Sequence, residues 1–397
     1  MNKYNSYKNL LSMIMLVGLT VSSFVQAKNE LADAINLDYQ DRLGAMFKDF
    51  HANPELSTAE FVTAKKMAKA LRNHGFDVTE SVGGTGIVAL LENGPGPLVM
   101  MRADMDGLPV KEMSGLPYAS KATQLDPITN KTFPVMHACG HDVHITSLIG
   151  TAKQMVDLKE HWSGTLMLIG QPAEERVIGA RAMMEDNLWQ RFGKPDYALA
   201  FHVSSILPSG VINVVEGAPF AGADTVDIYV RGIGAHGASP HAGKDPIVLG
   251  SQIVMALQTL VSRELPPRQP GVVTVGAFHS GTKHNIISEL AHLQLTVRNT
   301  NLDTRDTLLK GIKRIAENLG RAAGLPEDKL PEVVYSEEST PPTVNNAAMA
   351  RRLKQVWEKG MGKDRVTAIE AEGMGAEDFP FFTTDPEITS VYFSVGG

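Results

Sequence analysis

The sequence has one cysteine, Cys139, among its 397 residues. A single cysteine excludes an intrachain disulfide framework. Basic residues are also scarce relative to acidic ones, with 37 Lys and Arg against 44 Asp and Glu and a formal net charge of -7. This balance argues against a nucleic-acid partner or an anionic membrane surface, because both attract basic protein surfaces.

Low-complexity segments and internal repeats are absent from the sequence as well. The hydrophobic fraction of 43% and the charged fraction of 20% are typical of an ordinary globular protein. A chain of 397 residues is too long for one simple layered core. We therefore expect two domains.

The N-terminus has the pattern of a signal peptide. Lys3 and Lys8 precede an apolar run from Leu10 to Val25, and the small residue Ala27 provides a cleavage site. A membrane anchor is the alternative, but the run is shorter than the ~20 apolar residues that a membrane span needs. We expect residues 1–27 to be removed from an exported protein, periplasmic or secreted, that has no membrane contact afterwards.

Short apolar runs alternate with helical stretches in the first half of the chain. Four runs are predicted strands, at residues 87–91, 98–102, 165–170 and 197–202. Helical stretches such as residues 145–158 lie between them. The alternation predicts an α/β fold with a mainly parallel sheet and helices on both faces. Sheets of this kind carry their chemistry at the carboxyl ends of the strands.

After residue 217 the pattern changes. A strand, a helix, two strands, a helix and a final strand predict a smaller α+β sandwich inserted into the larger domain. We therefore divide the chain into a signal peptide at 1–27, a catalytic domain at 28–218 and 337–397, and an inserted lid or dimerisation domain at 219–336.

The segment 136–144, Met-His-Ala-Cys-Gly-His-Asp-Val-His, is the densest group of chemically active residues. Burying so many polar groups without a partner would be costly, so the pattern favours a metal site. Cys139 as thiolate and His141 as neutral imidazole are the best ligands, and Gly140 lets the backbone turn between them. Asp142 either joins this site or caps a helix that begins at Ile145.

Two acidic pairs follow predicted strands. Asp104 and Asp106 are alternate residues and so lie on one face. Glu174 and Glu175 are consecutive and point in different directions, so one can bind a metal while the other activates water. Either pair alone would also suit a solvated loop. Together with the cysteine and histidine cluster, they favour hydrolysis by a metal-activated water with a carboxylate as general base.

Six motifs then occur in a fixed order along the chain: R-A-D-M-D-G-L-P, H-A-C-G-H-D, Q-P-A-E-E, F-H-V, G-A-H-G-A-S-P-H and G-M-G-A-E-D-F. In this order they resemble the M20 metallopeptidase clan, specifically its hippurate hydrolase and auxin-conjugate amidohydrolase branch. Cys139, in place of a carboxylate or histidine ligand, is the mark of that branch. The resemblance covers nearly the whole mature chain, from His51 onward.

The resemblance implies a site for two divalent metal ions, which could be zinc, manganese, cobalt or nickel. Glu174 would be the general base, Asp106 would orient a site histidine or modulate the metals, and Asp104 would be a helper. The implied protein ligands of the metals are Cys139, His141, Glu175 and His202.

In the inserted domain, the resemblance implies that His236 and Asn285 reach the substrate, with His236 polarising the scissile carbonyl across a domain or dimer interface. Arg298 either pairs with a substrate carboxylate or is a surface arginine at the end of a strand. A homodimer through the inserted domain is expected on the same basis.

The implied activity is hydrolysis of the amide bond of N-acyl amino acids of the hippurate or aminoacylase kind. A carboxypeptidase or dipeptidase acting on small peptides is the alternative within the clan. Members of the clan continue past the strand at 388–395 with another metal-ligating histidine, whereas this chain ends at Gly397. A metal-binding protein impaired in catalysis is therefore a third hypothesis.

Overall fold

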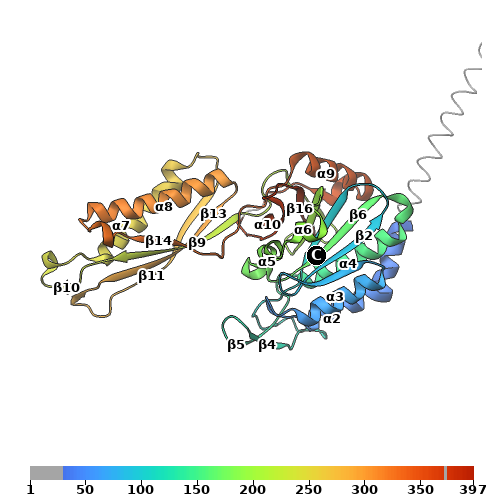
Figure 1. Cartoon of the computed structure of the whole chain (residues 1–397), viewed down its shortest axis with the longest axis horizontal. Helices are drawn as coiled ribbons and strands as arrows, with labels where there is room; N and C mark the ends of the chain where they lie inside the picture. Colours follow the sequence, from blue (N-terminus) through green and yellow to red (C-terminus); the bar gives the residue numbers. More distant parts are fainter. Residues whose placement is uncertain (1–29, 371–372) are drawn as a thin grey trace, which may run out of the picture.

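The computed structural model describes residues 30–370 and 373–397, as two bodies joined side by side (Figure 1). The predicted signal peptide lies outside these residues and stays a prediction. Within the described ranges, no helix is long and apolar enough to cross a membrane.

The larger body is built on an eight-stranded sheet with the order β1-β2-β6-β3-β7-β16-β8-β15. Its four central strands, β6, β3, β7 and β16, run parallel to one another. Antiparallel pairs occur only towards the two edges. The predicted α/β class is confirmed. The strands are β1 (Asp77–Val82), β2 (Gly86–Asn93), β3 (Leu98–Asp104), β6 (Gly164–Gln171), β7 (Tyr197–Ser204), β8 (Ile212–Asn213), β15 (Val366–Thr367) and β16 (Thr389–Gly396).

Helices cover both faces of this sheet because successive side chains of each strand point to opposite sides. In β6, Leu168 packs with Met67 and Ile149 of the helices on one face. The next residue, Ile169, packs with Met183 on the other. The first face carries α2 (Gly44–Ala52), α3 (Phe61–Asn73) and α4 (His141–Asp157), and the second α5 (Gly179–Glu185), α6 (Leu188–Phe192) and α10 (Pro380–Thr383). Near β16, α9 (Ala347–Met361) packs against a smaller cluster.

The smaller body is an antiparallel sheet with the order β11-β13-β9-β14, covered on one face by two helices. Asp245 caps the first of these helices by accepting bonds from the backbone N–H groups of Ile247 and Val248. The elements are β9 (Gly222–Arg231), α7 (Pro246–Thr259), β11 (Gly271–Ser280), β13 (Leu290–Asn299), α8 (Leu302–Ala322) and β14 (Glu332–Tyr335). They confirm the inserted α+β sandwich, and the domain bounds of 219–336 stay a prediction.

A short ribbon, β10 (Ala235–His236) paired with β12 (Ile286–Ile287), extends the inserted domain at the end farthest from the larger body (Figure 1). A hairpin of β4 (Thr123–Asp126) and β5 (Lys131–Pro134) projects from the larger body. The sequence patterns did not predict this hairpin.

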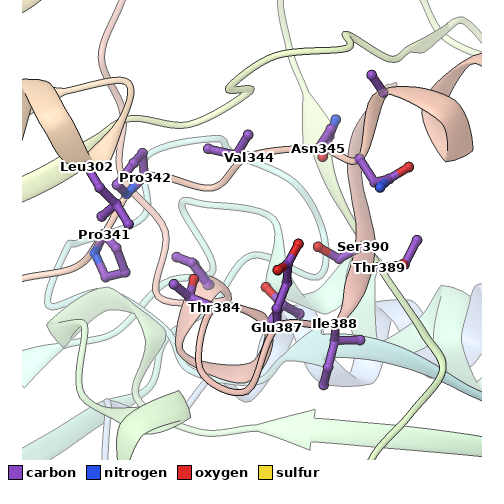
Figure 2. Close-up of a pocket in the computed structure, with 14 residues that line it drawn as sticks. Leu302, Pro341, Pro342, Val344, Asn345, Thr384, Glu387, Ile388, Thr389 and Ser390 are labelled. Carbon is purple, nitrogen blue, oxygen red and sulfur yellow. The ribbon is translucent and has the colours of Figure 1, made fainter.

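The junction of the two bodies contains a cavity of about 510 Å³. Figure 2 shows Leu302, Pro341 and Pro342 on one side of it and Thr389 and Ser390 of β16 on the other. None of the described residues that line it is a predicted metal ligand. The cavity is therefore separate from the predicted metal site.

Candidate metal centre

The predicted ligands converge where three parallel strands end. β3 ends at Asp104 and β6 ends three residues before Glu174, while His202 lies near the end of β7. Cys139 precedes the first turn of α4, which begins at His141. Gly140 between them has φ 81, a left-handed conformation that favours glycine. The carboxyl edge of the sheet thus gathers side chains that are far apart in the sequence, as parallel sheets do at their binding sites.

The distances between these side chains are those of a single centre. The Sγ of Cys139 lies 3.2 Å from the Nε2 of His202. The Nε2 of His141 lies 3.9 Å from a carboxylate oxygen of Glu174 and 3.9 Å from one of Glu175. His141 belongs to three sets of possible ligand atoms in which all atoms lie within 4.8 Å of one another. It shares one set with Cys139 and His202, one with Glu174 and Glu175, and one with Asp104 and His144. The structure therefore brings all four predicted ligands and the predicted base together.

The chemistry of these residues fits divalent cations. Among the described residues, the Nε2 of His141 and the Oε1 of Glu175 are buried and have no hydrogen-bond partner. A buried polar atom without a partner costs about 1–3 kcal/mol, so such atoms call for a ligand. Thiolate, imidazole and carboxylate donors together suit zinc and the neighbouring transition metals.

Burial also sets the charges of the centre. It raises the pKa of Glu175 to about 7. It raises the pKa of Glu174 well above its usual value, and the carboxylates of Glu377 and Asp378 raise that pKa further. Burial lowers the pKa of His202 to about 4, so this imidazole is neutral, as a metal ligand must be. A bound cation stabilises carboxylate anions, so crowded acids of this kind are compatible with metal binding.

Asp106 contacts both the loop of Glu174 and Glu175 and the ring of His141. Its carboxylate accepts hydrogen bonds from the Ser57 hydroxyl at 2.6 Å and from the backbone N–H groups of Glu174 and Glu175 at 3.2 and 3.1 Å. It also lies 3.3 Å from the Nδ1 of His141. A carboxylate in this position can fix the orientation of a ligating histidine, which is the role that the resemblance implies.

Comparison with known proteins identifies the family. The family model described as Peptidase family M20/M25/M40 matches residues 100–397. The chain belongs to this family. It is an M20 metallo-hydrolase, as the order of its motifs predicts.

Relatives of this M20 chain differ in the activities for which they are named. Hippurate hydrolase of Campylobacter jejuni is 36% identical over 347 residues, which are 87% of this chain and 86% of that protein. Thermostable carboxypeptidase 2 of Saccharolobus solfataricus is 36% identical over 90% of this chain and 86% of its own length. Among solved structures, a dinuclear metal-binding peptidase of the M20 family from Bacillus subtilis has a TM-score of 0.74 at 28% identity, and the match covers 90% of this chain and 89% of that one. The family is thus fixed and the substrate is left open.

Sequence reasoning missed a buried arginine beside the M20 metal centre. Arg102, 1% exposed, pairs with Asp104 at 2.5 Å, Glu377 at 3.0 Å and Asp378 at 3.3 Å. It also donates from Nε to Gln171 at 2.7 Å. Burial alone would raise the pKa of Asp104, but the guanidinium of Arg102 holds it well below its usual range.

Asp104 in turn holds His144, the third histidine of the dense segment. The Nδ1 of His144 lies 2.5 Å from Asp104, and its Nε2 accepts a hydrogen bond from the backbone N–H of Val203 at 2.9 Å. Both ring nitrogens are therefore occupied. His144 supports the β7 strand that carries His202 rather than offering a free metal ligand.

The alternative role of Asp142 as a helix cap was wrong. Helix α4 begins at His141, four residues earlier than Ile145, and no side chain in the described part of the chain caps it. Asp142 lies in the first turn, and its carboxylate is 2.6 Å from the Nδ1 of His51. Gly140, in its left-handed conformation, occupies the N-cap position, so the helix begins at His141 rather than at Ile145.

Two of the three predicted substrate residues, His236 and Asn285, lie apart from the metal centre. His236 belongs to β10 and Asn285 directly precedes β12, so both lie in the ribbon at the far end of the inserted domain (Figure 1). The backbone N–H of Gly237 donates to the carbonyl of Asn285 at 2.8 Å, which holds the two segments together. Arg298 lies near the opposite end of the inserted sheet, where it pairs in register with Ala223 at the start of β9. Within one chain, the structure does not bring His236 or Asn285 to the site.

Proposed function

We propose that this protein hydrolyses the amide bond of N-acyl amino acids of the hippurate type. One observation carries the proposal: Glu174, a buried carboxylate that is not a predicted ligand, lies beside the two predicted ligands His141 and Glu175. Hydrolysis of an amide by a metal-activated water uses such a base next to a Lewis acid. The similarity to hippurate hydrolase supports the substrate class.

The chain's own residues define the steps. When bound, two divalent cations would polarise the amide carbonyl and acidify a water molecule. Cys139, His141, Glu175 and His202 would hold these cations. Glu174 takes the proton from the attacking water and returns it to the leaving nitrogen, and burial, which raises the pKa of this carboxyl, makes it a stronger base. The products are a free carboxylic acid and an amino acid.

We further propose that His236 acts in a homodimer, at the metal centre of the partner chain. The far position of the β10 and β12 ribbon in Figure 1 supports action between chains. The inserted domain also exposes apolar side chains on the outer side of α7, namely Ile247, Val248 and Met255. Such side chains are typical of a surface that another molecule covers.

A substrate panel tests the activity. With N-benzoyl and N-acetyl amino acids, we expect release of the free acyl acid, loss of turnover after chelation, and recovery on adding back zinc, manganese, cobalt or nickel. Quantifying both products by chromatography distinguishes the alternatives. Cleavage restricted to unblocked peptides would favour the carboxypeptidase or dipeptidase. Retained metal without turnover on any of these substrates would reject the enzymatic proposal in favour of a metal-binding protein.

Mixing two inactive variants tests the role of His236. Glu174→Gln and His236→Ala should each be nearly inactive alone. In a mixed dimer, one site combines an intact Glu174 with the intact His236 of the other chain, so activity should partly return after unfolding and refolding the mixture. Two separately refolded pools, combined only in the assay, are the control. If no activity returns while mixed dimers form, His236 does not act between chains.

A further inference from the structure

The loop that carries Glu174 and Glu175 has an unfavourable backbone. Ala173 has φ 48 and Val177 has φ 58, both in the left-handed region. Residues with a side chain rarely adopt this region, because Cβ lies too close to the backbone. The loop closes on itself through a bond from the N–H of Val177 to the carbonyl of Glu174 at 2.7 Å. Groups outside the loop must stabilise this conformation.

Glu60 is such a group. It is 0% exposed and directly precedes α3. Its Oε1 accepts the backbone N–H of Ala173 at 2.8 Å and that of Thr58 at 2.9 Å. Its Oε2 accepts the hydroxyl of Thr85 at 2.6 Å. Three segments that are distant in the sequence are thus tied together by one buried carboxylate.

Glu60 and Asp106 together receive three consecutive backbone N–H groups. The N–H of Ala173 points to Glu60, and those of Glu174 and Glu175 point to Asp106. The direction of each peptide in this stretch determines where the next side chain points. Displacing Ala173 would therefore move the base and the ligand that follow it.

We propose that Glu60 is a positioning residue of the metal centre, which acts through Ala173 to hold Glu174 and Glu175 in place. Its effect on turnover rests on the proposed function of Glu174. Its effect on metal binding acts through Glu175 and can be measured without any substrate.

Removing the carboxylate tests the proposal. Glu60→Ala should weaken binding of Co²⁺ and lower kcat, each by about 10- to 100-fold, as is usual when a support of a metal ligand is lost. Co²⁺ binding is followed by its visible absorption, and circular dichroism checks that the variant is folded. Glu60→Gln keeps an acceptor oxygen of the same reach, so it should recover most of both properties.

A second substitution provides a rescue that general loss of stability would not give. Glycine adopts a positive φ at little cost, so Ala173→Gly lets the loop keep its conformation with less support. Added to Glu60→Ala, it should restore part of the Co²⁺ affinity and of kcat. If Glu60→Ala loses Co²⁺ affinity and Ala173→Gly restores none of it, the proposal is overturned.

Glu55 offers a matched control. Its carboxylate accepts the backbone N–H groups of Val62 at 3.1 Å and Thr63 at 2.6 Å, and so supports α3 rather than the loop. Glu55→Ala should lower Tm but leave Co²⁺ affinity unchanged. The proposal is overturned if Glu60→Ala behaves in the same way.

Two further results are informative. If Glu60→Ala does not fold, Thr85→Val removes only the bond to Oε2, and an unchanged Co²⁺ affinity in that variant would contradict the proposal. If the wild-type protein binds Co²⁺ but hydrolyses no N-acyl amino acid, the proposed function fails. The Co²⁺ affinities of the Glu60 variants then still decide on the positioning role.

Discussion

Glu174→Gln is expected to lower kcat by about 10²- to 10⁴-fold, the usual contribution of general acid and base catalysis. Glutamine has the same size but cannot take a proton from water or return one to the leaving nitrogen. The bound metal should remain, because the predicted ligands are intact. Turnover of the best substrate of the panel and elemental analysis of the same preparation measure the two effects.

The neighbouring carboxylate is the control for this experiment. Glu175→Gln removes a predicted ligand, so it should lower metal content as well as turnover. Glu174 and Glu175 lie at the same distance, 3.9 Å, from the Nε2 of His141, and so a general disturbance of the site would affect metal binding equally in the two variants. Turnover near the wild-type rate in Glu174→Gln would refute its role as the base.

Arg102→Met is expected to lower the free energy of unfolding by about 3–5 kcal/mol, the range observed when one partner of a buried ion pair is removed. Methionine fills much of the space of the arginine stem but leaves Asp104, Glu377 and Asp378 without their cation. These side chains are nearly inaccessible to water, so solvent cannot compensate the lost attraction. Urea unfolding, with the midpoint and slope compared, measures the loss.

Two variants sharpen this prediction. Arg72 pairs with Glu80 on the surface, where both side chains are well exposed, so Arg72→Met should cost only about 0–1 kcal/mol. Adding Glu377→Gln to Arg102→Met removes one uncompensated charge and should recover part of the stability. Equal losses in Arg72→Met and Arg102→Met would show that the buried network contributes no more than a surface pair.

Much of the fold could be predicted from local patterns. The predicted strand at 165–170 lies within β6 (Gly164–Gln171), and that at 98–102 within β3 (Leu98–Asp104). Such buried strands have continuous apolar sequences, which makes them recognisable. The β4 and β5 hairpin could not be found in this way, because its strands have only four residues each and β4 is the polar sequence TQLD.

The sequence predicts candidate ligands for the metal centre, but not the residues that support them. The ligands fall in dense motifs, where residue type alone suggests chemistry. Arg102 and Glu377 are 275 positions apart, and only the folded chain shows that they pair. Likewise, nothing in the sequence distinguishes Glu60 from any other acidic residue before a helix. Its hydrogen bond from the backbone N–H of Ala173, 113 positions away, can be found only in the folded chain.

The two bodies of the molecule have separate hydrophobic interiors. The buried residues in the interior of the inserted domain fall between Val226 and Leu325, and no buried residue of the other three clusters falls in that range. Amino-acid changes in the inserted domain can therefore accumulate without disturbing the packing that supports the predicted metal ligands. An architecture of this kind lets selectivity diverge among descendants while the hydrolytic machinery is inherited intact.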